Sequence, residues 1–222
     1  MRLLITGNMG YVGPAVVQEL RRRYPDAILD GFDAGYFAHC LTTSDGLPER
    51  LLDRQLFGDV RDPRGLDLAG YDAVILLAAV SNDPMGERFG QVTRAINQDA
   101  AVAIGKAAAD AGVRNLVFAS SCSVYGVAHG GPRTEQDPVN PVTIYAASKI
   151  DAETALTSIG GDTVVTCLRF ATACGMSARL RLDLVLNDFV ACALTTGKIT
   201  VLSDGSPWRP LIDIADMARA ID

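Results

Sequence analysis

The chain has 222 residues, of which 49% are hydrophobic and 21% are charged, and its formal net charge is −6 at pH 7. This balance is typical of a globular protein with one large core, or with one core and a small lobe. The negative charge argues against nucleic acid as a partner, because a duplex-binding face needs clustered Lys and Arg.

The sequence also disfavours membrane, secreted and metal-binding proteins. No apolar run approaches the roughly 18 residues of a membrane span, and the first apolar run is too short for a signal peptide. The five Cys form no CxxC pair, and the two His, His39 and His129, lie far apart. We therefore expect no metal site, no disulfide framework and a cytoplasmic protein.

Short, nearly continuous apolar runs alternate with longer amphipathic stretches along the first 170 residues. The runs predict buried strands at 3–6, 27–32, 73–80, 115–119 and 163–168. The stretches predict helices at 11–23, 92–111 and 144–159. Repeated strand-then-helix order predicts an α/β domain over residues 1–170, with a doubly wound parallel sheet of Rossmann type.

The pattern changes after Gly175. We predict one amphipathic helix at 178–197, a short strand at 199–202, a turn at Asp204-Gly205 and a helix at 214–222. These elements would form a partial substrate lobe over residues 171–222. The chain stops within the last helix, so we expect that a continuation is missing.

The segment from Gly7 to Gly13 joins the first predicted strand to the first predicted helix and has the pattern GxxGxxG, with Gly10 in the middle. Glycine permits a tight turn whose backbone N–H groups approach a pyrophosphate, and the helix N-terminus favours an anion. Pro14 suits a first helical turn. In this strand–turn–helix context the pattern predicts dinucleotide binding, with a plain connecting turn as the alternative.

Asp33 ends the second predicted strand, 20 residues after Gly13. A carboxylate at this place accepts hydrogen bonds from the adenine ribose and repels a 2′-phosphate, which favours NAD over NADP. Asp30 is a competing candidate, although it falls inside the strand. Asp33 is also compatible with a simple turn, because Asp33-Ala34-Gly35 has turn composition.

Tyr145 and Lys149 are four residues apart in a predicted helix and so share one face. A nearby ammonium stabilises the phenolate, which makes Tyr145 a proton acceptor near neutral pH. The hydroxyl-rich run 119–126 follows a buried strand, where doubly wound sheets bind ligands. Together they predict proton transfer at a substrate hydroxyl, whereas a lone Tyr–Lys pair would more often be a surface feature.

In combination these residues resemble the extended short-chain dehydrogenases, the nucleotide-sugar epimerase/dehydratase family. The resemblance covers nearly the whole chain. The further motifs that carry it are Gly58-Asp59-Val60-Arg61-Asp62, Leu77-Ala78-Ala79-Val80-Ser81, Asn97, Leu168-Arg169-Phe170 and residues 204–209.

The resemblance implies NAD as the cofactor, a nucleotide-activated sugar as the substrate and a homodimer. It implies catalysis by Ser121, Tyr145 and Lys149, with Ser121 chosen over Ser120 and Ser123 because it lies four residues before Tyr125. The implied cofactor residues are Gly7, Gly10, Tyr11, Val12, Gly13, Asp33, Asp59, Val60, Leu77, Ala78, Ala79, Asn97, Tyr145 and Lys149. The implied substrate residues are Ser81, Ser121, Ser123, Thr172, Asn187 and Arg209.

The sequence also departs from the family. Sugar 4,6-dehydratases usually carry Asp-Glu just after the catalytic hydroxyl, where this chain has Cys122-Ser123. Cys122 lies one place before the Cys of epimerase–reductases, so we interpret it as a packing residue. Thr172 replaces a common Asn, and Asp213 replaces a common His. Members usually run well beyond 222 residues.

Three hypotheses follow. The first is an NAD-dependent epimerase that acts at C4 of a nucleotide sugar through a transient keto intermediate. The second is a one-way reductase, oxidase or dehydratase of a biosynthetic pathway. The third is a truncated, non-catalytic dinucleotide-binding module, which the early stop favours and the intact set of Ser121, Tyr145 and Lys149 opposes.

Overall fold

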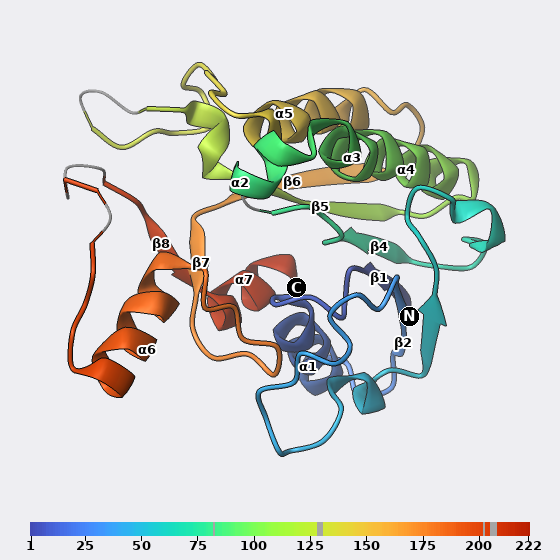
Figure 1. Cartoon of the computed structure of the whole chain (residues 1–222). Coiled ribbons are helices and arrows are strands. Elements are labelled where there is room, and N and C mark those ends of the chain that lie inside the picture. Colours follow the sequence, from blue (N-terminus) through green and yellow to red (C-terminus); the bar gives the residue numbers. More distant parts are fainter. Residues whose placement is uncertain (82, 128–130, 202, 205–207) are drawn as a thin grey trace.

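The computed structural model describes residues 1–81, 83–127, 131–201, 203–204 and 208–222. A six-stranded parallel sheet lies between two layers of helices, and a two-stranded sheet stands at one end (Figure 1). The predicted doubly wound α/β class is therefore confirmed. His129, Leu202 and Gly205, which appear in the sequence predictions, lie outside the described residues.

The large sheet has the strand order β3-β2-β1-β4-β5-β6, and every neighbouring pair is parallel. The order reverses between β1 and β4, where such sheets bind ligands at the carboxyl ends of their strands. The strands are β1 (Arg2–Thr6), β2 (Ile28–Asp33), β3 (Arg54–Phe57), β4 (Ala73–Leu76), β5 (Asn115–Ser121) and β6 (Val164–Phe170).

All five predicted strands are present, but two details of the sheet differ from the prediction. The edge strand β3 was not predicted, because it is short and begins with the polar pair Arg54-Gln55. The predicted strand at 73–80 ends at Leu76, since the chain leaves the sheet after Leu77 donates its N–H to the Thr6 carbonyl at 3.1 Å. Residues 77–80 therefore lie in the loop that follows β4 at the carboxyl edge of the sheet.

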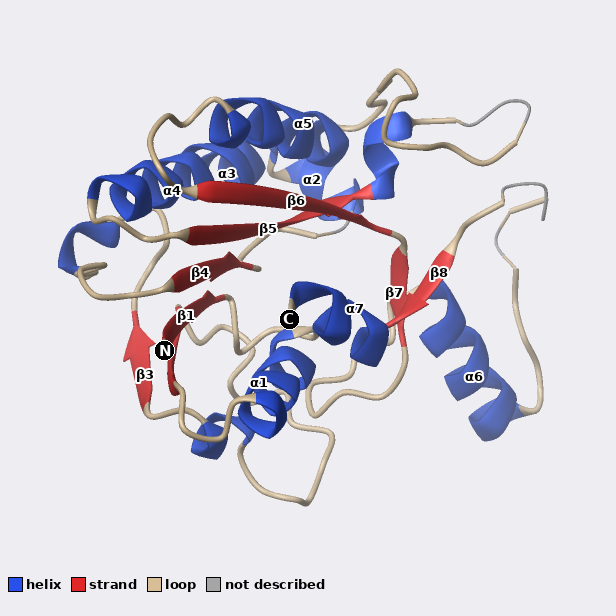
Figure 2. Ribbon diagram, turned by 180° about the vertical axis from the view of Figure 1, so that it is seen from behind, coloured by secondary structure: helices blue, strands red, loops and turns tan. Residues whose placement is uncertain are grey.

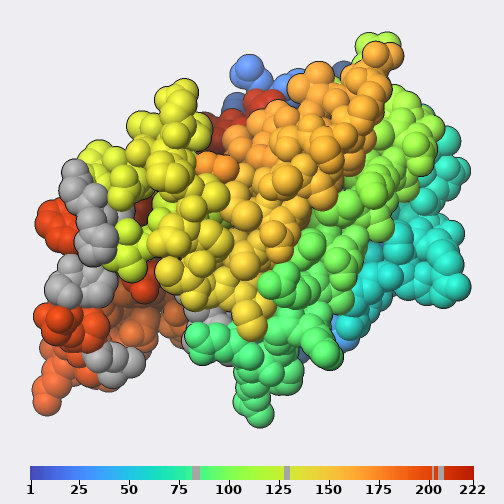
Figure 3. All heavy atoms as spheres, turned by 90° about the horizontal axis from the view of Figure 1, so that it is seen from above, coloured from blue at the N-terminus to red at the C-terminus, as the bar shows by residue number. Residues whose placement is uncertain are grey.

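Helices cover both faces of the sheet (Figure 2). α1 (Gly13–Arg23) and α7 (Ile214–Ile221) lie on one face, and α5 (Ile144–Thr157) lies on the other with the run formed by α3 (Gly90–Arg94), the π-helical turn η3 (Ala95–Ala100) and α4 (Ala101–Asp110). Seen from above, α5 and α4 run side by side over the sheet (Figure 3). The shorter helices are α2 (Asp83–Arg88), η1 (Pro48–Leu51), η2 (Pro63–Gly65) and η4 (Cys122–Tyr125).

The side chains of β1 point alternately to the two faces of the sheet, and the core forms one cluster on each face. Leu4 faces the layer of α4 and α5, with Ile104 and Leu156 among its fully buried partners. Leu3 and Ile5 face α1 and α7 on the opposite side. This double burial explains the continuous apolar runs of the sequence. Of the described helices, none combines the length and the apolar character needed to cross a bilayer.

The end of the chain builds a small lobe and then returns to the large sheet. β7 (Thr172–Cys174) and β8 (Leu211–Asp213) pair in parallel, beside α6 (Val185–Thr196). α7 then packs against α1 in the core. The division at residue 170 stays a prediction, although the return of α7 joins the far end of the chain to the Rossmann core.

Two predictions for this lobe were wrong, and two short strands were not predicted. The predicted helix 178–197 begins only at Val185, because the segment before it forms turns and contains Arg179, which is buried in an ion pair with Glu49. Residues 199–201 are not a strand. The strands β7 and β8 were not predicted, since each has only three residues. The last helix was predicted correctly to Ile221.

A buried carboxylate fixes the amino-terminal edge of the large sheet. Asp30 of β2 is fully buried and pairs with Arg2 of β1 at 3.2 Å and with Arg54 of β3 at 2.7 Å. Tyr71 donates its hydroxyl to the same carboxylate at 2.5 Å, and burial raises the pKa of that phenol. Asp30 therefore joins three strands, so its position inside β2 is structural.

We expect Asp30→Ala to lower the free energy of unfolding by about 3–5 kcal/mol, because two partly buried guanidinium groups lose their counter-charge. Urea denaturation at neutral pH measures the change. Asp216→Ala is the matched control, since Asp216 forms an exposed pair with Arg219 and should cost less than about 1 kcal/mol. Equal losses in the two variants would contradict this account.

Candidate active site

The loops after β1, β4 and β5 meet at the carboxyl edge of the sheet, where the strand order reverses. The loop after β1 is the glycine turn, the loop after β4 contains residues 77–81, and β5 ends at Ser121. α5 lies over the same edge and carries Tyr145 and Lys149. The fold thus brings together residues that are more than 100 positions apart in the sequence.

The glycine turn is packed too closely for side chains at two of its three glycines. Gly7 has φ +75°, and a Cβ there would lie 2.5 Å from the backbone nitrogen of Ala78. A Cβ on Gly13 would overlap the backbone of Asn8. Gly10 closes the turn by donating its N–H to the Gly7 carbonyl at 3.2 Å. The predicted glycine pattern therefore has a steric reason.

The turn leaves backbone donors without a protein acceptor. Within the described chain, the N–H groups of Tyr11, Val12 and Gly13 make no hydrogen bond, and no side chain caps α1. Three such donors at the positive end of a helix form a ready site for an anion. The turn therefore fits the pyrophosphate of a dinucleotide.

Asp33 stands beside this turn at the end of β2. One oxygen accepts the Met9 N–H at 3.0 Å and the other accepts the Gly35 N–H at 2.8 Å. Asp33 thus fixes both the glycine turn and the loop that follows β2. Contact between Asp33 and a ribose stays a prediction, whereas Asp30 lies at the opposite end of the strand.

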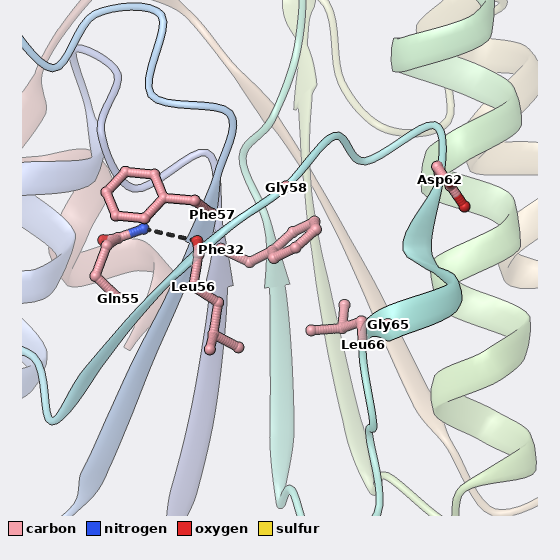
Figure 4. Close-up of a pocket in the computed structure, with 8 residues that line it drawn as sticks. All are labelled: Phe32, Gln55, Leu56, Phe57, Gly58, Asp62, Gly65 and Leu66. Carbon is pink, nitrogen blue, oxygen red and sulfur yellow. Dashed lines mark hydrogen bonds between the residues drawn. The ribbon is translucent and has the colours of Figure 1, made fainter.

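A cavity of about 320 Å³ lies next to Asp59 and Val60, two of the cofactor residues that the resemblance implies. Asp59 and Val60 follow Gly58 of its lining, and Asp59 pairs with Arg61, whose hydrogen bonds lower the pKa of the Asp59 carboxyl. Figure 4 shows the side chains of Phe32, Leu56 and Leu66 around the hollow. The lining residues are Phe32, Gln55, Leu56, Phe57, Gly58, Asp62, Gly65 and Leu66.

The loop after β4 is held in place by a buried amide. Asn97 accepts the Val80 N–H at 2.8 Å and donates to the Val80 carbonyl at 2.9 Å and to Ser148 at 3.3 Å. Asn97 lies in the π-helical turn η3, a local widening often found at functional sites. Asn97 positions the predicted cofactor residues Leu77, Ala78 and Ala79 through Val80, and a direct cofactor contact stays a prediction.

The two serine side chains at the end of β5 point in different directions. Ser120 is buried and turned toward Glu153 of α5. Ser121 faces the other way and caps η4, where its Oγ accepts the Ser123 N–H at 3.2 Å and the Ser123 hydroxyl at 2.9 Å. Neighbouring strand residues point to opposite faces, and the buried Ser120 hydroxyl is already bound to Glu153, whereas the choice of Ser121 as the catalytic hydroxyl stays a prediction. Burial raises the pKa of the neighbouring Cys122 thiol, which Arg209 opposes.

Lys149 is an almost fully buried ammonium at the base of the site. Its Nζ donates to the Ala119 carbonyl at 2.7 Å and lies 4.7 Å from the ring centre of Phe118 and 5.8 Å from that of Tyr145. Burial lowers the pKa of Lys149 from 10.5 to about 8, while the charge of Glu153 raises it. Lys149 and Tyr145 are thus close, as the spacing of four predicted.

Two of the three predicted substrate residues of the lobe lie close together, because the Thr172 N–H donates to the carbonyl of Pro210, next to Arg209, at 3.0 Å. The third, Asn187, bonds to Gly175 at the other end of β7. Asn187 is buried and uses its amide inside the protein, accepting from Gly175 N–H and donating to Tyr11 Oη and the Arg181 carbonyl at 3.0, 3.0 and 2.9 Å. Thr172 belongs to β7, and Arg209 is exposed before β8. Substrate contacts by Asn187, Thr172 and Arg209 stay predictions.

Two groups of functional interest were missed by the sequence reasoning. Arg181 of the lobe donates to the Ser81 hydroxyl at 2.6 Å and pairs with Asp183, so it connects a predicted substrate residue to the lobe. Glu153 and Arg169 form a second set behind Ser121. Two features of the sequence could have indicated this second set: the spacing of four between Lys149 and Glu153, and the place of Arg169 in the Leu168-Arg169-Phe170 motif.

Comparison with known proteins places this geometry in a family. Residues 3–222 match the NAD dependent epimerase/dehydratase family. The chain belongs to this family. The predicted resemblance is therefore confirmed, together with the Rossmann-type fold that it implied.

Individual relatives include both epimerases and dehydratases. UDP-glucose 4-epimerase of Corynebacterium glutamicum is 28% identical over 239 residues, which cover 99% of this chain and 69% of that protein. The crystal structure of DesIV, a dTDP-glucose 4,6-dehydratase from Streptomyces venezuelae with NAD bound, has a TM-score of 0.83 at 28% identity and covers 100% of this chain and 70% of its own. MoeE5 in complex with UDP-glucose and NAD has a TM-score of 0.82 at 27% identity, with the same coverage.

The buried ammonium predicts a pH-dependent gain of stability on its removal. The folded state holds the Lys149 proton less tightly than the unfolded chain, so wild-type stability rises between about pH 8 and pH 10.5. Below about pH 8 the buried charge lowers the free energy of unfolding by about 3 kcal/mol. Lys149→Met also loses the bond to Ala119, worth about 1 kcal/mol. We expect Lys149→Met to be about 2 kcal/mol more stable than wild type at neutral pH.

Urea denaturation of both proteins across this pH range measures the difference, which should shrink as the pH rises. Lys106→Met is the control, because Lys106 is an exposed lysine on α4 and its loss should change little. A Lys149→Met protein that is less stable than wild type at every pH would refute the interpretation.

Proposed function

We propose that this protein is an NAD-dependent epimerase that acts at C4 of a nucleotide-activated sugar through a transient keto intermediate. The observation that carries the proposal is the buried Lys149 ammonium, which lies close to Tyr145 and bonds to Ala119, two residues before Ser121, at the sheet edge that also carries the open glycine turn. A protein that only bound a dinucleotide would have no need of a buried ammonium beside a tyrosine. The related UDP-glucose 4-epimerase supports the choice of reaction.

NAD fits the residues of the glycine turn. The three unbonded N–H groups of Tyr11, Val12 and Gly13 would hold the pyrophosphate, and Asp33 would accept the adenine ribose hydroxyls and disfavour a 2′-phosphate. DesIV and MoeE5 both bind NAD.

Tyr145 would accept the proton of the reacting sugar hydroxyl, as the carbon atom is oxidised to the ketone, and give it back after the sugar has turned. The Lys149 ammonium favours the phenolate form of Tyr145, because opposite charges attract across a buried and weakly screened space. Ser121 would donate its hydroxyl to the same substrate oxygen. Proton, hydride and oxidation state are all restored at the end of the cycle, so no cofactor is consumed.

Dehydration is the competing outcome, because the related DesIV is a 4,6-dehydratase. Elimination of water from a sugar needs an acid and a base beside the keto intermediate. The two residues after Ser121 are Cys122, whose thiol pKa is raised by burial, and Ser123, whose hydroxyl is bonded to Ser121. Neither has a carboxyl group, so the sequence and the geometry favour epimerisation.

The homodimer, the cytoplasmic location and the particular sugar and nucleotide belong to the same proposal. DesIV and MoeE5 support a nucleotide sugar as the substrate, through a dTDP-glucose activity in the first and bound UDP-glucose in the second. The net charge of −6 agrees with the absence of nucleic acid from the proposed partners. Size-exclusion chromatography with light scattering measures the oligomeric state directly.

We expect Gly13→Ala to weaken NAD binding by at least about tenfold, since a Cβ there overlaps the Asn8 backbone and must open the turn. Isothermal titration with NAD measures the affinity. Gly160→Ala is the control, because a Cβ at Gly160 meets no atom within 4 Å and Gly160 lies outside the lining of the cavity, so this variant should bind NAD as the wild type does. Normal affinity in Gly13→Ala would place the dinucleotide elsewhere.

We expect Tyr145→Phe to lower kcat by about 10²–10⁴-fold, as is typical for the loss of a general base, with little change in NAD affinity. The assay incubates enzyme, NAD and a panel of UDP and dTDP sugars, and identifies products by mass and NMR. An epimer of unchanged mass without accumulation of NADH supports the proposal. Loss of water would indicate a dehydratase, net NADH an oxidase, and wild-type activity in Tyr145→Phe would exclude this catalytic role.

A further inference from the structure

A buried carboxylate lies directly behind the proposed catalytic residues. Glu153 of α5 is 6% exposed and accepts a hydrogen bond from the Ser120 hydroxyl. It also accepts from Arg169 of β6, at 3.1 Å from Nε and 2.7 Å from Nη2. Each of its two oxygens therefore has a donor, and the charge has an opposite charge beside it.

Arg169 extends this contact to the loop after β5. Its Nη1 donates to the Tyr125 hydroxyl at 2.8 Å, and its guanidinium lies 5.1 Å from the ring centre of Tyr125. Tyr125 ends η4, the short helix that Ser121 caps. One carboxylate therefore connects α5, β5, β6 and η4, and it reaches Ser121 from both sides, through Ser120 and through Tyr125.

Glu153 also acts on Lys149. The two residues are four apart on α5 and so lie on one face of the helix, one turn from each other. Glu153 is the acidic group whose charge favours the Lys149 ammonium against the effect of burial. The two form no ion pair, because Lys149 donates to Ala119 and Glu153 is bound by Arg169.

Other ionisable groups also lie around Glu153 and Lys149. The positive charge of Arg169 offsets the negative charge of Glu153. Burial raises the pKa of the Cys167 thiol of β6 to about 11 and so keeps it protonated. Tyr145 shares the helix face of Lys149. On the outer face of α5, Asp151 pairs with Arg94 of α3 at 3.1 Å, and both are exposed to solvent.

We propose that Glu153 is a positioning residue of the active site, which keeps the Lys149 ammonium charged and fixes the Ser121 loop through Ser120, Arg169 and Tyr125. Stability alone does not explain the ion pair between Glu153 and Arg169, because a buried ion pair often stabilises a protein no more than apolar residues of equal volume. The position of Glu153 does explain it, since the carboxylate binds Ser120, the residue before Ser121, and is linked through Arg169 to Tyr125 at the end of η4. The activity part of this inference rests on the proposed function, whereas the charge of Lys149 can be measured without it.

The test uses NMR titration of lysine side chains, which is practical because the chain has three lysines, Lys106, Lys149 and Lys198. Lys106 and Lys198 are exposed and serve as internal references. The assignment of the Lys149 signal comes from its loss in Lys149→Met. We expect Glu153→Gln to lower the Lys149 midpoint by at least about half a pH unit, because a nearby negative charge is lost.

Two further variants separate charge from geometry. Glu153→Asp keeps the charge and should hold the Lys149 midpoint near the wild-type value, with a lower kcat because the shorter side chain cannot reach Ser120 and Arg169 together. Arg169→Gln should raise the midpoint, since it leaves the carboxylate unopposed. If Glu153→Gln does not fold, the upward shift in Arg169→Gln decides the question.

The matched control is Glu49→Gln, which breaks the other buried Arg–Glu pair, with Arg179, away from the catalytic residues. It should leave the Lys149 midpoint unchanged. In assays, the alkaline limb of kcat/KM should move to lower pH in Glu153→Gln and stay in place in Glu49→Gln. An unshifted Lys149 midpoint in folded Glu153→Gln, or an equal shift in Glu49→Gln, would overturn the inference. A shifted midpoint in a protein without nucleotide-sugar activity would overturn the proposed function and leave the inference standing.

Discussion

The close contact between the glycine turn and the end of β4 is the constraint on which the rest of the molecule depends. A Cβ at Gly7 would lie 2.5 Å from the Ala78 nitrogen, so the two loops meet only because the side chain is missing. This contact lets α1 begin directly above the sheet edge with its first N–H groups unbonded. The anion site is thus a consequence of how closely the first strand–turn–helix unit packs on its neighbour.

The small lobe is tied to this same turn. Tyr11 donates its hydroxyl to the Gly175 carbonyl at 2.7 Å, and the Ser177 hydroxyl donates to the Tyr11 carbonyl at 2.6 Å. Arg179 and Glu49 join the next part of the lobe to the loop after β2. The segment that leads to the proposed substrate residues is therefore fixed by residues next to the cofactor turn, which places the two proposed ligands within reach of one another.

The catalytic end of the site shows a conflict between stability and function. Lys149 is buried where an ammonium is costly, and Glu153 offsets only part of that cost. The same burial makes its charge effective on Tyr145, because little water screens it. The buried Glu153 carboxylate is in turn paired with Arg169. The proposed proton transfer at Tyr145 therefore depends on charged residues of both α5 and β6.

Local patterns predicted the parts of the fold that depend on local physics. The strands β1, β2, β4, β5 and β6 and the helices α1, α5 and α7 follow from apolar period and turn residues, and the proximity of Tyr145 and Lys149 follows from their spacing. The extent of α6 could not be predicted, since residues 178–184 have helical composition but form turns around the buried Arg179, whose partner Glu49 is distant in the sequence. The strands β3, β7 and β8 were too short to give a period.

The sequence by itself determined the fold class, the glycine turn and the proximity of Tyr145 and Lys149, because each depends on residues within one element or one turn. Only the tertiary structure decided what Asn187, Asn97, Glu153 and Arg169 contact. The hydrogen-bond partners of their side chains lie between 6 and 176 residues away along the chain. A side chain that can hydrogen-bond equally well to substrate or to protein acquires its role from the neighbours that the folded chain places beside it.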